Sequence, residues 1–150
     1  MMDDIKEFPK ILVGKSLKKI GRCANLAWFI FGAEESFSIH VQCPWRLISN
    51  NNVLIASNDI YVPKDLTYSE DFNWDSIGAT LFDKKAEKFN AEEKRVVKLV
   101  DINALGDILM LFDNIKLETF VDNSSREEQW RFFQKGGKHM VVRPSSIEWE

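Results

Sequence analysis

The sequence predicts a mainly antiparallel β fold of the α+β class, in which two related four-stranded meanders form a sandwich or a partly closed barrel. Three observations predict this fold. Apolar residues alternate with polar ones over most of residues 17–55, as they do in half-buried strands. Residues 95–150 repeat the same succession of strands and turns. Between these halves, residues 63–94 are richer in charge and hold one segment of helical periodicity.

The composition indicates a single globular domain, residues 1–150. Hydrophobic residues make up 45% of the chain and charged residues 29%, and 150 residues can bury a core without a disulfide or a metal. The 20 basic and 23 acidic side chains give a net charge of -3. We therefore expect neither a nucleic acid nor an anionic membrane as partner, because both require a concentrated positive patch.

The N-terminal residues, the apolar stretches and the cysteines all indicate the same cellular compartment. The first ten residues are charged and lack the apolar run of a secretory signal, which predicts a cytoplasmic protein. The longest strongly apolar stretch, residues 26–33, is too short to span a membrane. Cys23 and Cys43 belong to no CxxC pair, so we expect free thiols in a reducing compartment.

Strands of the first half are expected at residues 17–23, 26–31, 37–45 and 53–57. The segment at 26–31 is apolar on both of its faces, which predicts a central strand covered on two sides. Pro44 cannot donate to a strand ladder, so the next strand runs along an edge there or turns a corner before Trp45. Three asparagines at 50–52 supply a turn.

The second half follows the first at an almost constant offset. Trp130 stands 85 positions after Trp45, and an arginine follows each tryptophan. These matches predict an internal pseudo-repeat of residues 14–62 and 95–150. Strands of the second half are expected at residues 95–102, 107–112, 115–121, 130–134 and 139–143.

One amphipathic helix is expected between the halves, at residues 82–93. Phe82, Ala86 and Phe89 follow one another at spacings of four and three with charged residues around them, so a narrow apolar stripe would lie on the sheet. A second, short helix is expected at residues 3–12.

The string HVQCPWR at residues 40–46 is the most distinctive segment. A thiol beside an imidazole suggests a nucleophile pair. Residues three apart on a regular strand point to opposite faces, however, so His40 and Cys43 meet only if the strand bulges. With two histidines in the chain and no ligand pair at metal-binding spacing, we expect no catalytic residue, no metal and no cofactor.

The tryptophan–arginine pairs are the basis for a candidate polar pocket. Trp45 and Trp130 are expected in the core, which places the arginine after each on the opposite face. Glu118 is the carboxylate best placed to pair with either arginine. The structural interpretation is that these groups clamp strand ends, and the functional interpretation is that they recognise a carboxylate on another molecule. The candidate pocket residues are His40, Gln42, Arg46, Glu118 and Arg131.

The loop before the helix is the candidate surface for a protein partner. Three aromatic residues alternate there with three acidic ones, and such a mixture suits a protein interface. The alternative is that these aromatics cover the core as a lid. The candidate partner-binding residues are Tyr68, Glu70, Asp71, Phe72, Trp74 and Asp75.

Three strings resemble segments of a set of small bacterial proteins: HVQCPWR at 40–46, the Trp-Arg-Phe at the end of residues 128–132, and the Phe-x-Asp-x-Ser at 120–124. The resemblance extends over about residues 14–142 and implies no catalytic residue. In size and acidity the chain is also similar to immunity proteins, which neutralise a secreted toxin.

These observations together favour a non-enzymatic cytoplasmic protein, of the immunity type, that masks a protein partner. The alternative is a β barrel with a small-ligand or enzymatic pocket lined by polar strand residues. Either a monomer or a homodimer paired through strand edges is compatible with the sequence.

Overall fold

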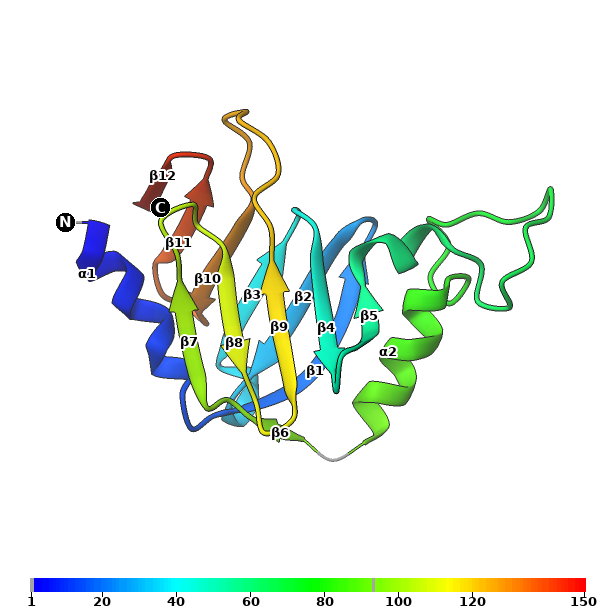
Figure 1. The fold of residues 1–150 in the computed structure, drawn as a ribbon, viewed down its shortest axis with the longest axis horizontal. Coiled ribbons are helices and arrows are strands. Elements are labelled where there is room, and N and C mark those ends of the chain that lie inside the picture. The colour runs from blue at the N-terminus through cyan, green and yellow to red at the C-terminus, as the bar shows by residue number, and fades with distance from the viewer. Residues whose placement is uncertain (1, 93) are drawn as a thin grey trace.

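The computed structural model describes residues 2–92 and 94–150 and shows two antiparallel sheets packed face to face (Figure 1). The large sheet has the strand order β12-β11-β10-β3-β2-β1-β6, and the small sheet has the order β5-β4-β9-β8-β7. The mainly antiparallel α+β fold is confirmed, and the sheets form an open sandwich. The strands are β1 Ser16–Cys23, β2 Leu26–Phe31, β3 Phe37–Val41, β4 Trp45–Ser49, β5 Asn52–Ala56, β6 Arg95–Val96, β7 Leu99–Ile102, β8 Ile108–Leu111, β9 Ile115–Thr119, β10 Trp130–Gln134, β11 His139–Arg143 and β12 Ser146–Trp149.

Each half of the chain contributes strands to both sheets. In the first half, β1, β2 and β3 form a meander in the large sheet, and the hairpin β4–β5 crosses to the small sheet. In the second half, β7, β8 and β9 form a meander in the small sheet, and β10 and β11 cross to the large one. The first crossing lies between Val41 and Trp45 and contains Pro44, so of the two alternatives that the sequence leaves open the structure has the corner. The two halves of the chain are therefore joined within each sheet, by pairing of β3 with β10 in the large sheet and of β4 with β9 in the small one.

The core lies between the sheets and is centred on Trp45 and Trp130, which are 2% and 0% exposed. The Trp45 indole packs edge-on against Phe29, with ring centroids 5.2 Å apart. The Trp130 indole N–H donates to the Gly106 carbonyl oxygen at 2.8 Å. As predicted, both tryptophans point inward, and the arginine that follows each lies on the outer face of its sheet.

Strand β2 differs from the expectation that both of its faces are covered. Ala27, Phe29 and Phe31 are buried, whereas the residues on its other face are only half-buried. The reason lies in β1: the Trp28 indole rests on Gly21, where an added Cβ would lie 2.1 Å from a ring carbon. The outer face of β2 is therefore covered in part by its own Trp28 indole lying on β1, and not by a second layer of structure as the sequence pattern predicts.

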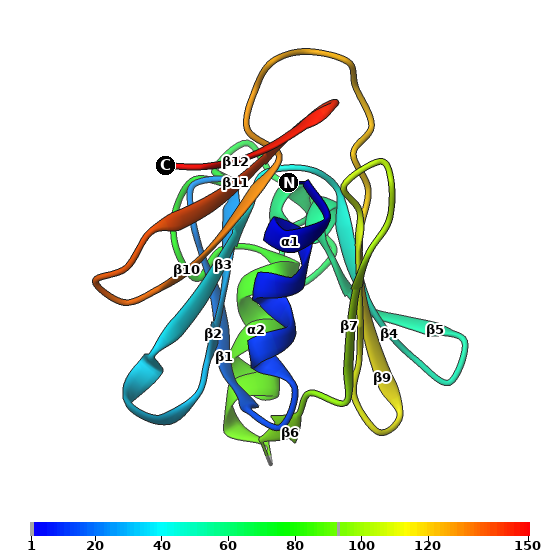
Figure 2. The same cartoon turned by 90° about the vertical axis from the view of Figure 1, so that its left-hand side faces the viewer.

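Helices close the two open sides of the sandwich. Helix α2 (Leu81–Ala91) contacts β1 and β5, while α1 (Met2–Glu7) contacts β12 and the adjoining 3-10 helix η1 (Phe8–Leu12) contacts β7. Figure 2 shows both helical segments between the sheets. The predicted stripe of α2 is buried. The predicted end of that helix, residue 93, lies outside the described residues. None of the helices described is long and apolar enough to cross a membrane.

Candidate functional site

The acidic loop, residues 64–79, connects the 3-10 helix η3 (Ser57–Tyr61) to α2 and extends away from the sandwich (Figure 1). Its two ends are hydrogen-bonded to each other. The Lys64 N–H donates to the Ala79 carbonyl oxygen at 3.1 Å, and just outside the loop the Leu81 N–H donates to the Val62 carbonyl oxygen at 2.7 Å. Closed ends of this kind define an Ω-loop, a type of loop that is frequently functional.

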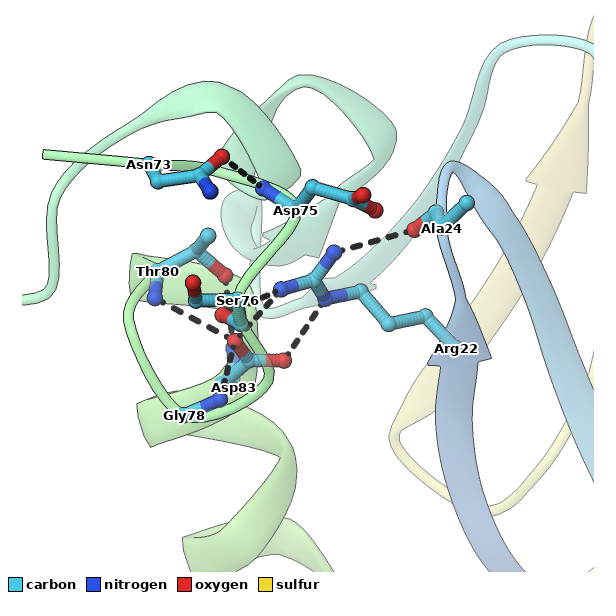
Figure 3. A network of polar contacts seen from close by, with 8 residues as sticks. All are labelled: Arg22, Ala24, Asn73, Asp75, Ser76, Gly78, Thr80 and Asp83. Carbon is cyan, nitrogen blue, oxygen red and sulfur yellow. Dashed lines mark hydrogen bonds and ion pairs between the residues drawn. The ribbon is translucent and has the colours of Figure 1, made fainter.

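A buried ion pair fixes the returning end of the acidic loop to β1 (Figure 3). The Arg22 guanidinium donates to both Asp83 carboxylate oxygens at 2.8 Å. A further Arg22 N–H donates to the Ser76 carbonyl oxygen at 3.1 Å, and another to Ala24 at 3.0 Å. The Arg22 side chain is 1% exposed and that of Asp83 is 10% exposed. The same guanidinium therefore attaches the loop to the sandwich, and moving it away from the loop would break its buried ion pair with Asp83.

Asp83 also organises the backbone where the loop becomes a helix. Its carboxylate accepts from the N–H of Gly78 at 2.9 Å and of Thr80 at 3.2 Å, and its own N–H donates to the Thr80 hydroxyl, which completes a capping box. Burial alone would raise the pKa of the Asp83 carboxyl, but the hydrogen bonds from Arg22, Thr80 and Gly78 outweigh burial and lower it. Asp83 is thus an anion that the fold stabilises.

The six predicted partner-binding residues all belong to the acidic loop, but they are not equally exposed. Tyr68 is 68% exposed, and the three acidic residues are exposed as well. Phe72 is half-buried and packs edge-on against Tyr68, with ring centroids 5.9 Å apart. Trp74 is half-buried against the core and lies 4.9 Å from the Tyr61 ring. One aromatic is therefore presented to solvent, while Trp74 acts in part as the lid of the alternative interpretation.

Two exposed apolar residues of the same loop, and the ion pair that anchors it, are not among the residues predicted from the sequence. Leu66 is 67% exposed and Ile77 is 69% exposed. Leu66 has φ 63, a backbone conformation that bulky side chains rarely adopt. Arg22 could have been found from the alternation that places it on the inward face with Ile20, since an inward arginine requires a partner. The Thr-x-x-Asp spacing of Thr80 and Asp83 is a helix-start signal.

The acidic loop is much more negatively charged, for its length, than the chain as a whole. It contains one lysine and four carboxylates, a net charge of -3, which equals that of the whole chain. Two side chains of the loop also fix its backbone. The Asp65 carboxylate accepts a hydrogen bond from the Thr67 N–H at 3.0 Å, and the Asn73 side-chain oxygen accepts one from the Asp75 N–H at 3.1 Å. The loop therefore combines a negative field with a defined backbone.

The five predicted pocket residues fall on two different sheets. His40 and Arg131 are register partners on the outer face of the large sheet, and Gln42 follows β3 just beyond them. Arg46 and Glu118 are register partners on the outer face of the small sheet, where their side chains form an ion pair of 3.3 Å. The structure brings each pair together, but the core separates one pair from the other.

On the large sheet, Arg131 is the centre of a polar cluster. Its guanidinium donates to Glu128 at 2.8 Å and to His139 Nδ1 at 2.8 Å. Because arginine can only donate, His139 accepts through Nδ1 in this contact. The hydrogen bond from Arg131 lowers the pKa of Glu128. Burial, followed by the Arg131 charge, lowers the pKa of His40, so this face disfavours a charged imidazole.

Cys43 and His40 do not form a nucleophile pair. Cys43 is 5% exposed on the inward side of the chain, while His40 lies on the outer face against the Phe133 ring. Burial raises the pKa of the Cys43 thiol to about 12, which keeps it protonated. Among the residues described, no group of three or more histidine, cysteine or acidic side chains is arranged to hold a metal ion.

Comparison with protein-family models, with curated proteins and with solved structures found no match to the chain. The resemblance to small bacterial proteins and to immunity proteins therefore stays a prediction from the sequence.

Proposed function

We propose that this chain is a non-enzymatic cytoplasmic binding protein of the immunity type, which masks a basic surface of a protein partner with its acidic loop. One observation carries the proposal. Leu66, Tyr68 and Ile77 are each about two-thirds exposed on a loop that also presents four carboxylates and is held by the Arg22–Asp83 pair. Large exposed apolar side chains rimmed by charge are typical of protein interaction sites.

The apolar and the acidic side chains of the loop contribute to binding in different ways. The tyrosine and the two aliphatic side chains supply the apolar contacts, and tyrosine is enriched among the residues that dominate binding energy. The carboxylates attract a positive surface and accelerate association. Because hydrogen bonds already close the loop and fix its return, less conformational freedom is lost on binding. A partner enzyme covered in this way would be inhibited without any reaction in the binding protein.

The proposal is tested by affinity capture with matched variants. The loop variant Leu66→Ser with Tyr68→Ser and Ile77→Ser removes the three exposed apolar side chains. The control is Leu105→Ser, because Leu105 is 67% exposed, as Leu66 is, but lies in the turn between β7 and β8. We expect the wild type and the control to retain the same basic partner and the loop variant to lose it, with circular dichroism showing the same fold for all three. Equal retention by the loop variant contradicts the proposal.

A further inference from the structure

A concave surface lies at the other end of α2, away from the acidic loop. It is a groove of about 360 Å³ between the C-terminal half of α2, strand β5 and the turn that joins β8 to β9. Its apolar lining includes Val53, Leu54, Phe89 and Ile115. Val53 is 53% exposed, so part of this apolar surface is open to solvent. A volume of this size falls within the range of small-molecule sites.

Cations surround this apolar lining. Among the residues that the structure describes, Lys85, Lys88 and Arg95 line the groove together with one carboxylate, Glu92, a balance of +2 for these four in a chain whose net charge is -3. A neighbouring cavity of about 360 Å³ shares Arg95 and adds two lysines and one aspartate. These two cavities at one end of α2 are thus lined by five basic side chains and two of the described carboxylates, whereas the acidic loop at its other end holds four carboxylates and one lysine.

Two of the cations are held in position. The Lys85 ammonium donates to the Leu54 carbonyl oxygen at 3.1 Å, which leaves two of its three N–H donors for another acceptor. The Arg95 guanidinium lies over the Phe89 ring, 4.5 Å from the centroid, and forms an ion pair of 2.9 Å with Glu92. An anion that enters the groove therefore meets the Lys85 ammonium already in a fixed place beside the apolar lining.

We propose that this groove binds an amphiphilic anion, that is, a carboxylate or phosphate group carried on an apolar body about the size of a medium-length acyl chain. The anionic group contacts Lys88 and Lys85 at the rim, and the apolar body lies on Val53, Leu54 and Ile115. The inference goes beyond the proposed function, since it involves no residue of the acidic loop and either site can exist without the other.

The test is a titration of the ¹⁵N-labelled protein followed by NMR, with three probes of defined chemistry. Octanoate has both the anion and the apolar body, octanamide lacks the charge, and inorganic phosphate lacks the apolar body. We expect octanoate to shift the amide signals of Ser49, Val53 and Asn114 saturably and those of the acidic loop not at all. Octanamide and phosphate should each bind at least about tenfold more weakly, because each loses one of the two contributions, worth about 1.4 kcal/mol per tenfold.

Two single variants and a control connect the effect to the groove. Lys88→Glu should weaken octanoate binding at least about tenfold by reversing a rim charge, and Val53→Asn should weaken it by removing apolar contact. Lys138→Glu makes the same charge change in the turn between β10 and β11 and should leave binding unchanged. The inference is overturned if octanoate causes no saturable shift, if octanamide binds equally well, or if Lys138→Glu weakens binding as much as Lys88→Glu.

A second copy of the chain is the other occupant that the charge distribution allows, since its acidic loop could face this groove. Sedimentation velocity distinguishes the two. A monomer at high concentration supports the small anion as occupant. Self-association that Lys88→Glu abolishes would overturn the inference and assign the groove to a neighbouring copy.

Discussion

Arg22 in β1 and Asp83 in the first turn of α2 form two parallel hydrogen bonds of 2.8 Å, although 61 positions separate them in the sequence. This pair joins β1, the strand next to the edge of the large sheet, to the helix that closes the sandwich. The same guanidinium donates to Ser76, so a single side chain also holds the acidic loop. Fold and candidate site therefore depend on the same contact.

Arg22→Met is expected to lower the free energy of unfolding by about 3 kcal/mol, because it leaves the buried Asp83 carboxylate without its cation. The matched control is Arg46→Met, which breaks the ion pair with Glu118 on the outer face of the small sheet. The Arg46 side chain is 45% exposed, so its loss should cost less than about 1 kcal/mol. Urea unfolding measures both, and equal costs for the two variants would contradict the assigned role of Arg22.

The pH dependence of stability is expected to contain a contribution from His40. Burial, and then the Arg131 charge, lower the pKa of His40 below 6.5, so the unfolded chain takes up this proton before the folded one does. The contribution of neutral His40 to the free energy of unfolding is therefore fully present above pH 6.5, and it is lost as the pH falls through the lower pKa that His40 has in the folded protein. The charged and titratable groups that face His40 are Glu128, Arg131 and His139.

The variant His40→Gln should flatten the slope of unfolding free energy against pH between about pH 7 and pH 5. The slope is the relevant quantity, since glutamine also loses the contact with the Phe133 ring and lowers stability at every pH. Below that window the wild type and the variant should lose stability in parallel, because the lowered pKa values of Glu128 and Asp83 act in both. An unchanged slope in the variant would show that His40 contributes nothing to it.

The two thiols are expected to differ sharply in reactivity. Cys23 is exposed, whereas Cys43 is buried and its pKa is raised to about 12 by burial. At pH 8, a disulfide reagent should titrate one thiol in the native protein and two in urea. In the variant Cys23→Ser the native protein should have no thiol that reacts, so the reagent should give no coloured product. Rapid native labelling of that variant would mean that Cys43 is accessible.

Much of the sheet architecture is predictable because alternation on a strand depends on local sequence. The strand at Phe37–Val41 and the hairpin strands at Trp130–Gln134 and His139–Arg143 follow the predicted boundaries to within a few residues. The corner at Pro44 is predictable as well, since proline cannot continue a ladder. In each case the deciding interaction lies within the segment itself.

Features that depend on distant partners are not predictable in this way. The predicted strand at 95–102 is divided into β6 and β7, which belong to different sheets, because the Val97 N–H pairs with Lys15 and the Lys98 N–H pairs with Leu111. The predicted pocket is divided for the same reason: pairing of β4 with β9 takes Arg46 and Glu118 to the small sheet. Alternation tells which face a side chain occupies, but not the sheet to which its strand belongs.

The acidic loop was predictable as a candidate from its composition, but the exposure of its members was not. Trp74 and Tyr68 have the same aromatic character in the sequence, yet Trp74 packs on Tyr61 and Tyr68 faces solvent. The packing of Trp74 depends on η3, an element that ends before the loop begins. Leu66 and Ile77 lie outside the alternating motif and become candidates only when their exposure is known.

The most direct test of the central claim is the dissociation constant, measured calorimetrically, between this protein and the partner recovered by capture. The account predicts that Leu66→Ala or Tyr68→Ala raises the dissociation constant by about 30-fold, equivalent to about 2 kcal/mol for a residue central to an interface. It predicts no change for Leu105→Ala, and weaker binding of the wild type as salt screens the four carboxylates. The contradictory result is a dissociation constant that neither loop substitution nor salt alters.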